Sequence, residues 1–246
     1  MSKQLISKND TVEVYLDGGK IVKIFSPDSP KSKALYEALT AVRVEECGIL
    51  VPEIYEVSVN KGRWSITMEY IEGKTLAQMM EEDPQNIDKY LEQFVDIHTS
   101  IHKKQMPKLT KIKDKLSRQI SSLDIDDSKK YELLGRLEAM PKHSQLVHGN
   151  FTPRKIIFNE KGTYIIDWLA AKQGNPSADA GRTYLLLSIN NPELAEKYLD
   201  LFCAKTGIEK HHVQEWLPIV AAAQLVHNRP NERELLMKWC DVASYE

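Results

Sequence analysis

The sequence predicts an α+β protein of two lobes, a small antiparallel β-sheet lobe with one helix at residues 1–70 and a mostly helical lobe at residues 71–246. Three observations support this fold class. Segments of strand length, separated by turn residues, fill the first lobe. Segments with the 3.6-residue period of helices fill most of the second lobe. One further hairpin lies among those helices, at residues 155–166.

The first lobe is predicted to contain two hairpins and one helix. Its strands are expected at residues 11–16, 20–25, 53–59 and 64–70. Asp17-Gly18-Gly19 and Asn60-Lys61-Gly62 join them in pairs, because glycine adopts the backbone angles that tight hairpins need. A helix is expected at residues 30–47. We expect Ser7-Lys8-Asn9-Asp10, before the first strand, to form a loop.

The second lobe is predicted to be helical apart from its hairpin. Helices are expected at residues 75–82, 86–104, 127–140, 193–205, 209–228 and 232–242, and another opens with Ser177 as its N-cap. His98 and His102 lie four residues apart on an apolar helix face. No third metal ligand is evident, so packed or hydrogen-bonded histidines are favoured over part of a zinc site. The basic run between residues 103 and 118 is interpreted as a solvated face, since acidic residues bracket it.

Composition argues against several classes of protein. The chain has 246 residues, of which 42% are hydrophobic, and a formal net charge of −2. These values fit a folded globular protein and give no basis for a nucleic-acid or membrane partner. Three cysteines with no CxxC pair among them indicate reduced thiols and a cytoplasmic location.

The stretch at residues 146–168 organises the rest of the chain. A polar loop from His148 to Arg154 lies between two apolar segments. The hairpin that follows turns at Asn159-Glu160-Lys161-Gly162 and is expected to return Asp167 beside the loop. A carboxylate at the end of an apolar strand is costly to bury without a partner or a metal. This arrangement suits a phosphoryl-transfer site assisted by a cation.

The same stretch resembles the aminoglycoside phosphotransferase and choline kinase family, whose members have the protein-kinase-like fold. The family pattern is His-Gly-Asp, four residues, Asn, and later Ile-Asp-Trp or Ile-Asp-Phe. The matching residues are His148, Gly149, Pro153 and Asp167. Asn150 stands where the family has its catalytic Asp, and Lys155 stands where it has a metal-binding Asn. The resemblance therefore implies a degenerate catalytic loop.

The resemblance also implies nucleotide-binding residues. In the family, a lysine of the second strand pairs with an acid of the following helix and contacts the ATP phosphates, and Lys23 and Glu37 occupy these places. The alternatives are a solvated strand lysine for Lys23, and for Glu37 a surface pair with Lys33, worth about 0.3 kcal/mol. Glu45 or Glu46 could also take the acidic role.

Two further nucleotide-binding residues come from the segment at residues 68–76, which resembles the family's inter-lobe hinge. There, backbone groups of a strand edge bond the adenine, which assigns Glu69 and Ile71 to this role. The loop before the first strand covers the phosphates in the family and usually contains glycine, but residues 7–10 contain none. This is a third departure from the family pattern.

The remaining implied roles concern catalysis. Asp167 is expected to hold Mg²⁺ on the phosphates of ATP. Asp179 lies in a segment similar to the family's Ala-Asp-x-Ala-Arg-Thr-Tyr and is expected to bond the backbone of the catalytic loop, although a first-turn acid is also favoured by the helix dipole. His148, Asn150 and Lys155 complete the expected catalytic set, with ATP and Mg²⁺ as cofactors.

The two substitutions have different costs. An amide cannot act as a base, and loss of a general base costs roughly 10²–10⁴ in rate. A lysine ammonium about 4 Å from a divalent ion is repelled by roughly 8 kcal/mol at an effective dielectric of 20. Lys155 therefore excludes a metal from the Asn position, or stands in for it and leaves one magnesium on Asp167.

Three functions follow from these substitutions. The first is a nucleotide-binding pseudokinase with weak or lost transfer, for which a protein partner is expected. The second is an active kinase acting on an unusual small-molecule acceptor that is already ionised. The third is an interaction scaffold that binds no nucleotide.

Overall fold

The computed structural model describes residues 3–241. By their internal contacts these residues divide into two units. Unit 1 runs to Pro84 and includes Pro153–Leu169, whereas unit 2 comprises Gln85–Thr152 and the chain from Ala170 onward. The division into a nucleotide-binding lobe at residues 1–70 and a helical lobe at residues 71–246 remains a prediction.

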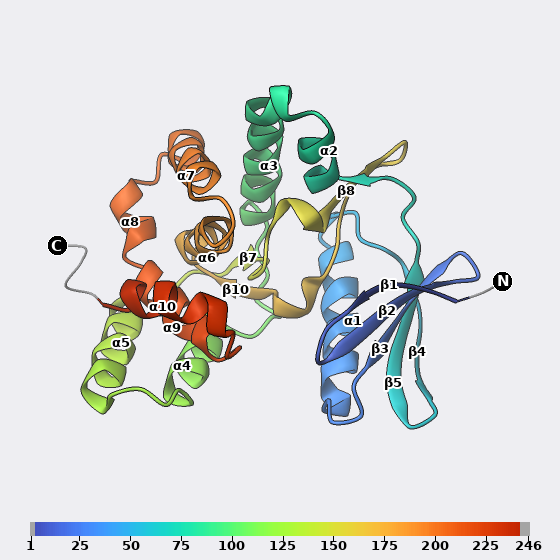
Figure 1. Cartoon of the computed structure of the whole chain (residues 1–246), viewed down its shortest axis with the longest axis horizontal. Coiled ribbons are helices and arrows are strands. Elements are labelled where there is room, and N and C mark those ends of the chain that lie inside the picture. The colour runs from blue at the N-terminus through green and yellow to red at the C-terminus, as the bar shows by residue number, and fades with distance from the viewer. Residues whose placement is uncertain (1–2, 242–246) are drawn as a thin grey trace. The chain divides into compact units, whose positions relative to one another are not determined.

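Unit 1 is built on a five-stranded antiparallel sheet with the order β1-β2-β3-β5-β4 (Figure 1). The strands are β1 Gln4–Lys8, β2 Val12–Asp17, β3 Lys20–Phe25, β4 Ile54–Asn60 and β5 Arg63–Glu69. Helix α1, Lys31–Glu45, packs on β4 and β5. Ala34 and Ala38 of this helix join Phe25 and Ile66 of the sheet in one buried cluster. Small residues on α1 thus let the helix lie close to the central strands.

A second, three-stranded sheet completes unit 1. Its strands are β6 Lys74–Thr75, β8 Ile156–Asn159 and β9 Gly162–Ile165, in the order β6-β8-β9. The helix α2, Leu76–Glu82, begins with a capping box between Thr75 and Gln78. In the β8–β9 turn, Oδ1 of Asn159 accepts hydrogen bonds from the backbone N–H groups of Lys161 and Gly162. The hairpin predicted at residues 155–166 is therefore present.

Unit 2 is mainly helical. Its helices are α3 Ile87–His102, α4 Ile112–Ser121, α5 Asp127–Ala139, α6 Pro176–Ser188, α7 Pro192–Thr206, α8 Lys210–Gln214, α9 Leu217–Leu225 and α10 Pro230–Trp239. Every residue of α9 is buried, and α4, α5, α6 and α10 pack around it. Two short strands, β7 Gln145–Val147 and β10 Lys172–Gly174, pair antiparallel. Short 3₁₀ turns lie at Pro84–Asn86, Pro153–Lys155 and Trp168–Ala170. The predicted α+β class is confirmed.

Several element predictions were wrong. Ser7 and Lys8 end strand β1 instead of lying in a loop, since they pair with β2. The helix predicted at 209–228 is divided into α8 and α9, and residue 242, the predicted end of the last helix, lies outside the described residues. The N-cap of α6 is Asn175, whose side chain accepts from the N–H of Ser177. Helix α4 was not predicted at all.

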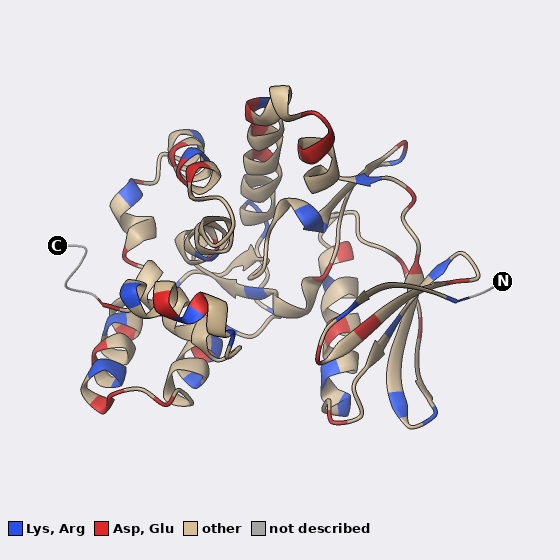
Figure 2. Cartoon of the chain, viewed as in Figure 1, with Lys and Arg blue, Asp and Glu red and all other residues tan. Residues whose placement is uncertain are grey.

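Charged residues of both signs are interspersed along α3, α5 and α7 (Figure 2). This distribution agrees with the small net charge of −2. No helix in residues 3–241 combines the length and the apolar character needed to cross a bilayer.

Candidate active site

Lys23 and Glu37 form a buried ion pair in unit 1. Lys23 lies on β3, a central strand, opposite Val14 of β2 and Ile66 of β5. Glu37 is 5% exposed and reaches Lys23 from α1. Burial lowers the pKa of Lys23, but the carboxylates of Glu37 and Asp167 outweigh it, and the net pKa lies above its ordinary value. Lys23 therefore carries a positive charge at neutral pH.

Asp167 links Lys23 to a second lysine. Its Oδ1 lies 3.5 Å from Nζ of Lys23, and its Oδ2 lies 2.6 Å from Nζ of Lys155. Asp167 follows β9 with a φ of 70°, a left-handed conformation that is uncommon for a residue other than glycine. The N–H of Ile166 donates to the C=O of Lys155, which joins the two ends of the hairpin beside this pair. Four side chains thus form a continuous chain of alternating charge, Glu37, Lys23, Asp167 and Lys155.

The donor set at Asp167 has the chemistry to hold one magnesium ion, as the family resemblance implies. Mg²⁺ in phosphate sites is commonly held by one or two carboxylates together with the phosphates and water. Asp167 supplies one such carboxylate, but both of its oxygens face an ammonium group. Lys155 is itself a cation and cannot be a metal ligand while protonated. The residues present do not fit a second magnesium ion.

Glu69 and Ile71 lie where β5 ends. Glu69 is the last residue of the strand, and its N–H donates to the C=O of Glu53. Ile71 is 5% exposed, and within residues 3–241 its backbone N–H and C=O take part in no backbone hydrogen bond. The role of both residues in holding adenine remains a prediction.

In unit 2, Asp179 is the centre of a buried hydrogen-bond network. It lies in the first turn of α6 and is fully buried. Its Oδ1 accepts from the N–H of Gly149 at 2.7 Å, and its Oδ2 accepts from the N–H of His148 at 2.7 Å. The structure therefore places Asp179 against the backbone of the catalytic-loop motif His148-Gly149-Asn150, as the family resemblance implied.

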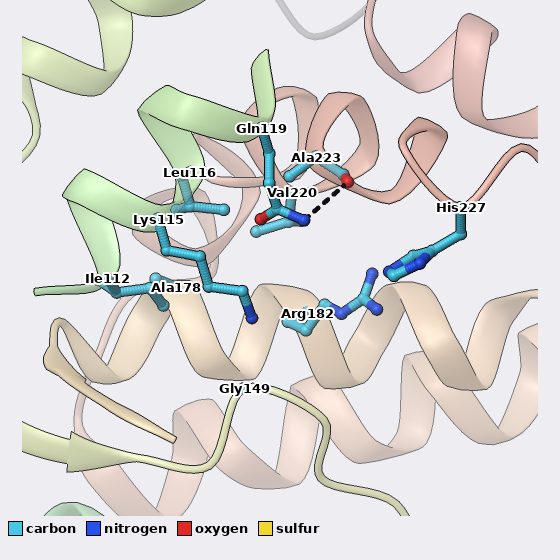
Figure 3. A pocket seen from close by; sticks show the side chains of 10 residues that line it. All are labelled: Ile112, Lys115, Leu116, Gln119, Gly149, Ala178, Arg182, Val220, Ala223 and His227. Atoms are coloured by element: carbon cyan, nitrogen blue, oxygen red, sulfur yellow. Dashed lines mark hydrogen bonds between the residues drawn. The ribbon is translucent and has the colours of Figure 1, made fainter. Parts of the chain in front are cut away.

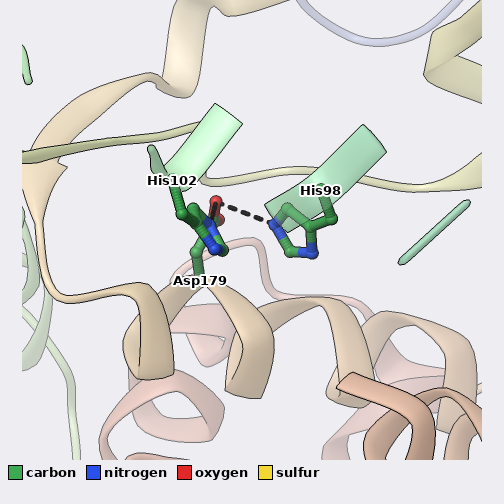
Figure 4. A group of neighbouring side chains, drawn as sticks. All are labelled: His98, His102 and Asp179. Carbon is green, nitrogen blue, oxygen red and sulfur yellow. Dashed lines mark hydrogen bonds and ion pairs between the residues drawn. The ribbon is translucent and has the colours of Figure 1, made fainter. Parts of the chain in front are cut away.

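Two histidines of α3 complete the network (Figure 4). The Nε2 atoms of His98 and His102 each lie 3.1 Å from Oδ2 of Asp179. A carboxylate only accepts, so both histidines donate from Nε2, and Nδ1 of His98 accepts from the hydroxyl of Tyr198 at 2.9 Å. Burial would raise the pKa of Asp179, but these histidine hydrogen bonds hold it well below its usual range. Burial lowers the pKa of His98 to about 4, so His98 is neutral at pH 7.

The same three side chains have the spacing of a metal site, with ligand atoms within 4.8 Å of one another. However, the two oxygens of Asp179 already accept four hydrogen bonds from His98, His102 and two backbone N–H groups. The favoured interpretation of His98 and His102 as hydrogen-bonded histidines is confirmed.

Gly149 is required by the shape of the motif. Its φ is +75°, and a Cβ atom there would lie 2.6 Å from the carbonyl oxygen of Ala170. His148 is fully buried, and its Nδ1 accepts from the N–H of Asn150 at 3.3 Å. His148 thus holds the backbone of the loop. Asn150 is half-buried, whereas His148 and Gly149 are buried.

Sequence reasoning missed two cationic residues of unit 2, Lys115 of α4 and Arg182 of α6. Both line a pocket together with Gly149. The interpretation of the basic run between residues 103 and 118 as a solvated face therefore fails at Lys113 and Lys115, which are only partly exposed. The helical spacing of Ile112, Leu116 and Ile120 could have predicted α4 and its buried face. Lys115 lies three residues after Ile112, on that face.

A model of the phosphotransferase enzyme family matches residues 6–216 of the chain. The chain belongs to this family. No curated protein sequence matches it significantly. The family resemblance stated from the His148-to-Asp167 motif is thereby confirmed.

Solved structures show the same phosphotransferase fold. A thermostable mutant of aminoglycoside phosphotransferase APH(4)-Ia in its apo form aligns with a TM-score of 0.72 at 12% identity, covering 98% of this chain and 93% of that one. LicA in complex with AMP aligns with a TM-score of 0.69 at 16% identity, covering 100% and 92%. A choline/ethanolamine kinase family protein from Mesorhizobium loti aligns with a TM-score of 0.61 at 14% identity, covering 98% and 85%.

Proposed function

We propose that the chain binds ATP with Mg²⁺ and has weak or lost phosphotransfer to ordinary hydroxyl groups, as in a pseudokinase. The observation that carries this proposal is the chain of alternating charge from Glu37 through Lys23 and Asp167 to Lys155. It keeps the two groups that a nucleotide needs, a protonated lysine and a carboxylate. It also adds an ammonium group to the carboxylate on which the family relies for metal.

Each residue of the chain of charge has a distinct part in binding. Lys23 neutralises phosphate oxygens of ATP, and Glu37 holds its ammonium group in place. Asp167 holds the magnesium ion, which when bound supplies positive charge to the phosphate oxygens. Lys155 replaces a second metal by contributing its own positive charge. Backbone groups of Glu69 and Ile71 bond the adenine. Solved relatives bound to ADP with hygromycin B, and to ATP with streptomycin, support a nucleotide as the ligand.

Transfer is limited by residue 150. An Asn side chain cannot take up the proton of an attacking hydroxyl, and loss of a general base costs roughly 10²–10⁴ in rate. Phosphoryl transfer depends mainly on positioning and electrostatics, so the remaining residues can still support slow turnover. A second candidate function, transfer to a small acceptor that is already anionic, is favoured by the cationic pocket beside Gly149.

Thermal unfolding with and without ATP tests the proposal. A ligand at about 100 times its Kd stabilises a protein by about 2.7 kcal/mol, and each kcal/mol raises the Tm of a domain of this size by about 2–4 °C. We expect ATP with magnesium to raise the Tm by several degrees, and Lys23→Met to abolish the increase. The matched control is Lys20→Met, which removes an exposed lysine from the same strand.

The outcomes separate the candidate functions. A Tm increase with little ATP consumption supports the proposal. Rapid phosphorylation of an aminoglycoside or sugar hydroxyl would contradict it, since a base other than Asn150 would then be present. The absence of any Tm increase at millimolar ATP would favour an interaction scaffold with a protein partner.

A further inference from the structure

Unit 2 contains a small pocket beside the catalytic-loop motif. Its volume is about 40 Å³, and its polar lining comes from Lys115, Gln119, Arg182 and His227, with Gly149 of the motif also lining it. Figure 3 shows the side chains of Lys115, Arg182 and His227 converging from α4, from α6 and from the segment after α9. Three separate elements thus direct nitrogen atoms into one space.

The lysine and the arginine of the pocket, Lys115 and Arg182, have no ion pair of their own. Within residues 3–241, neither Lys115 nor Arg182 has a side-chain hydrogen bond or a carboxylate within salt-bridge distance. Both side chains are only partly exposed. Holding two partly buried cations near one another without a counter-ion is unfavourable unless a ligand supplies the missing charge.

The nearest acids are already committed to other partners. Asp179 accepts four hydrogen bonds from His98, His102 and the backbone of the catalytic-loop motif. Glu232 accepts from Gln224 at 2.6 Å and from Arg229 at 2.8 Å. Gln119 donates its amide N–H to the carbonyl oxygen of Ala223. Lys115 and Arg182 therefore remain as positively charged hydrogen-bond donors that a ligand can use.

The electrostatics agree with this geometry. Burial, followed by the nearby charges of Lys172 and Arg182, lowers the pKa of Lys115 to about 8, against the opposing effect of Asp179. Burial also lowers the pKa of Arg182 to about 10, with Glu232 opposing it. The pKa of His227 is lowered by burial and by Arg182. Burial is thus the first cause at each group, and neighbouring cations add to it.

We propose that the pocket of Lys115, Arg182 and His227 binds an anionic group, a carboxylate or a phosphate, of the second substrate. The assignment of that group to a substrate rests on the second candidate function, transfer to an anionic acceptor, because Gly149 of the His148-Gly149-Asn150 motif lines the pocket. The volume of about 40 Å³ has room for a few water-sized groups, which suits one small headgroup of a larger molecule. A polycationic acceptor such as an aminoglycoside is disfavoured, since a further positive charge would meet Lys115 and Arg182.

Binding of small anions without nucleotide or magnesium tests the pocket directly. Inorganic phosphate and malonate are titrated by calorimetry at constant ionic strength, with chloride as the blank, and spermidine serves as the cationic probe. We expect phosphate or malonate to bind with a Kd of about 1 mM or lower, and Lys115→Met to weaken binding at least about tenfold. Whichever anion binds more tightly identifies a phosphate or a carboxylate as the natural group.

Control variants keep the result specific. Arg118→Met removes an exposed cation from the same helix, and should leave the Kd within about twofold. Arg182→Lys retains the positive charge but loses the planar guanidinium, which can donate two parallel hydrogen bonds to an anion. It should weaken binding less than Lys115→Met if charge dominates. It should weaken binding more than Lys115→Met if the paired hydrogen bonds dominate. Circular dichroism of each variant checks that it is folded.

The outcomes distinguish this proposal from ATP binding. Anion binding that is lost in Lys115→Met but kept in Lys23→Met supports the pocket, whatever the result with ATP. Anion binding that is lost in Lys23→Met but kept in Lys115→Met belongs to the phosphate lysine and overturns the proposal. Failure of phosphate and malonate to bind at about 10 mM, or preferential binding of spermidine, also overturns it.

Discussion

The Nζ atom of Lys155 lies 2.6 Å from Oδ2 of Asp167, so an ammonium group faces one oxygen of the carboxylate that we propose as the metal ligand. Lys23 faces the other oxygen at 3.5 Å. A lysine and a divalent ion compete for the same negative charge, so Lys155 should weaken the binding of magnesium to Asp167.

Removal of the Lys155 charge should strengthen magnesium binding. In Lys155→Met, Asp167 keeps Lys23 as a neighbour but loses the ammonium at Oδ2. The Mg²⁺ concentration that gives half of the ATP-dependent Tm increase should fall at least about tenfold, because the expected repulsion exceeds the 1.4 kcal/mol that a factor of ten represents. The control is Lys161→Met in the same hairpin, where the lysine is 73% exposed and lies 3.8 Å from Glu69. Equal magnesium dependence in both variants would contradict this prediction.

Restoration of the family residues should raise turnover only in combination. Asn150→Asp supplies a general base, and Lys155→Asn supplies a neutral metal ligand. Because both groups serve one chemical step, their effects should be non-additive. ATP consumption at saturating magnesium should rise at least about tenfold in the double variant over either single variant. The increase should vanish when Asp167→Ala is added, and equal background rates in all variants would place the defect elsewhere, as in the glycine-free segment at residues 7–10.

The free energy of unfolding should fall as the pH drops from 6.5 toward 4. The pKa of His98 is about 4 in the folded protein and about 6.5 when unfolded, so in this range the unfolded state binds one more proton. The stabilisation is present above pH 6.5 and is lost at about 1.4 kcal/mol per pH unit down to pH 4. Urea unfolding of His98→Gln should show a shallower pH slope. The control is His211→Gln, which changes a histidine whose side chain is 55% exposed.

Alanine at Gly149 should destabilise the protein. Its Cβ would lie 2.6 Å from the carbonyl oxygen of Ala170, and its φ of +75° is strained for alanine by about 1–3 kcal/mol. Gly135→Ala is the matched control, because Gly135 lies inside α5 with open space around it. That change should be neutral or stabilise by about 0.5–1 kcal/mol. Chemical unfolding of both variants measures the difference, and similar stabilities would show that the loop relaxes around the new methyl group.

Strand and helix positions were predictable where the periodicity was strong. The β2–β3 and β4–β5 hairpins follow from period-two segments with glycine turns, and α3 and α7 follow from long apolar faces. Strand β1 was missed because Gln4–Lys8 is exposed along its whole length and has no alternating pattern. Helix α4 was missed because its basic residues obscured the apolar spacing of Ile112, Leu116 and Ile120.

Contacts within the site depended on information that local patterns do not contain. The family resemblance named Lys23, Glu37, Asp167 and Asp179 as candidate site residues. The structure joins the first three in unit 1 and sets Asp179 on the motif backbone in unit 2. The direct pairing of Lys155 with Asp167 could not be read from spacing alone, because local patterns do not show the left-handed backbone that Asp167 adopts after β9. Similarly, the pocket at Lys115 and Arg182 requires residues from three elements that are distant in the sequence.

The network around Asp179 makes the shape of the His148-Gly149-Asn150 loop independent of the residue at position 150. Its hydrogen bonds come from α3, from α6 and from the backbone of residues 148 and 149, and none uses the Asn150 side chain. Substitutions at position 150 should therefore leave the backbone conformation of the loop unchanged. Aspartate, histidine or cysteine can be tried there in turn, and differences in rate between such variants would report the chemistry of the side chain with little contribution from a rebuilt loop.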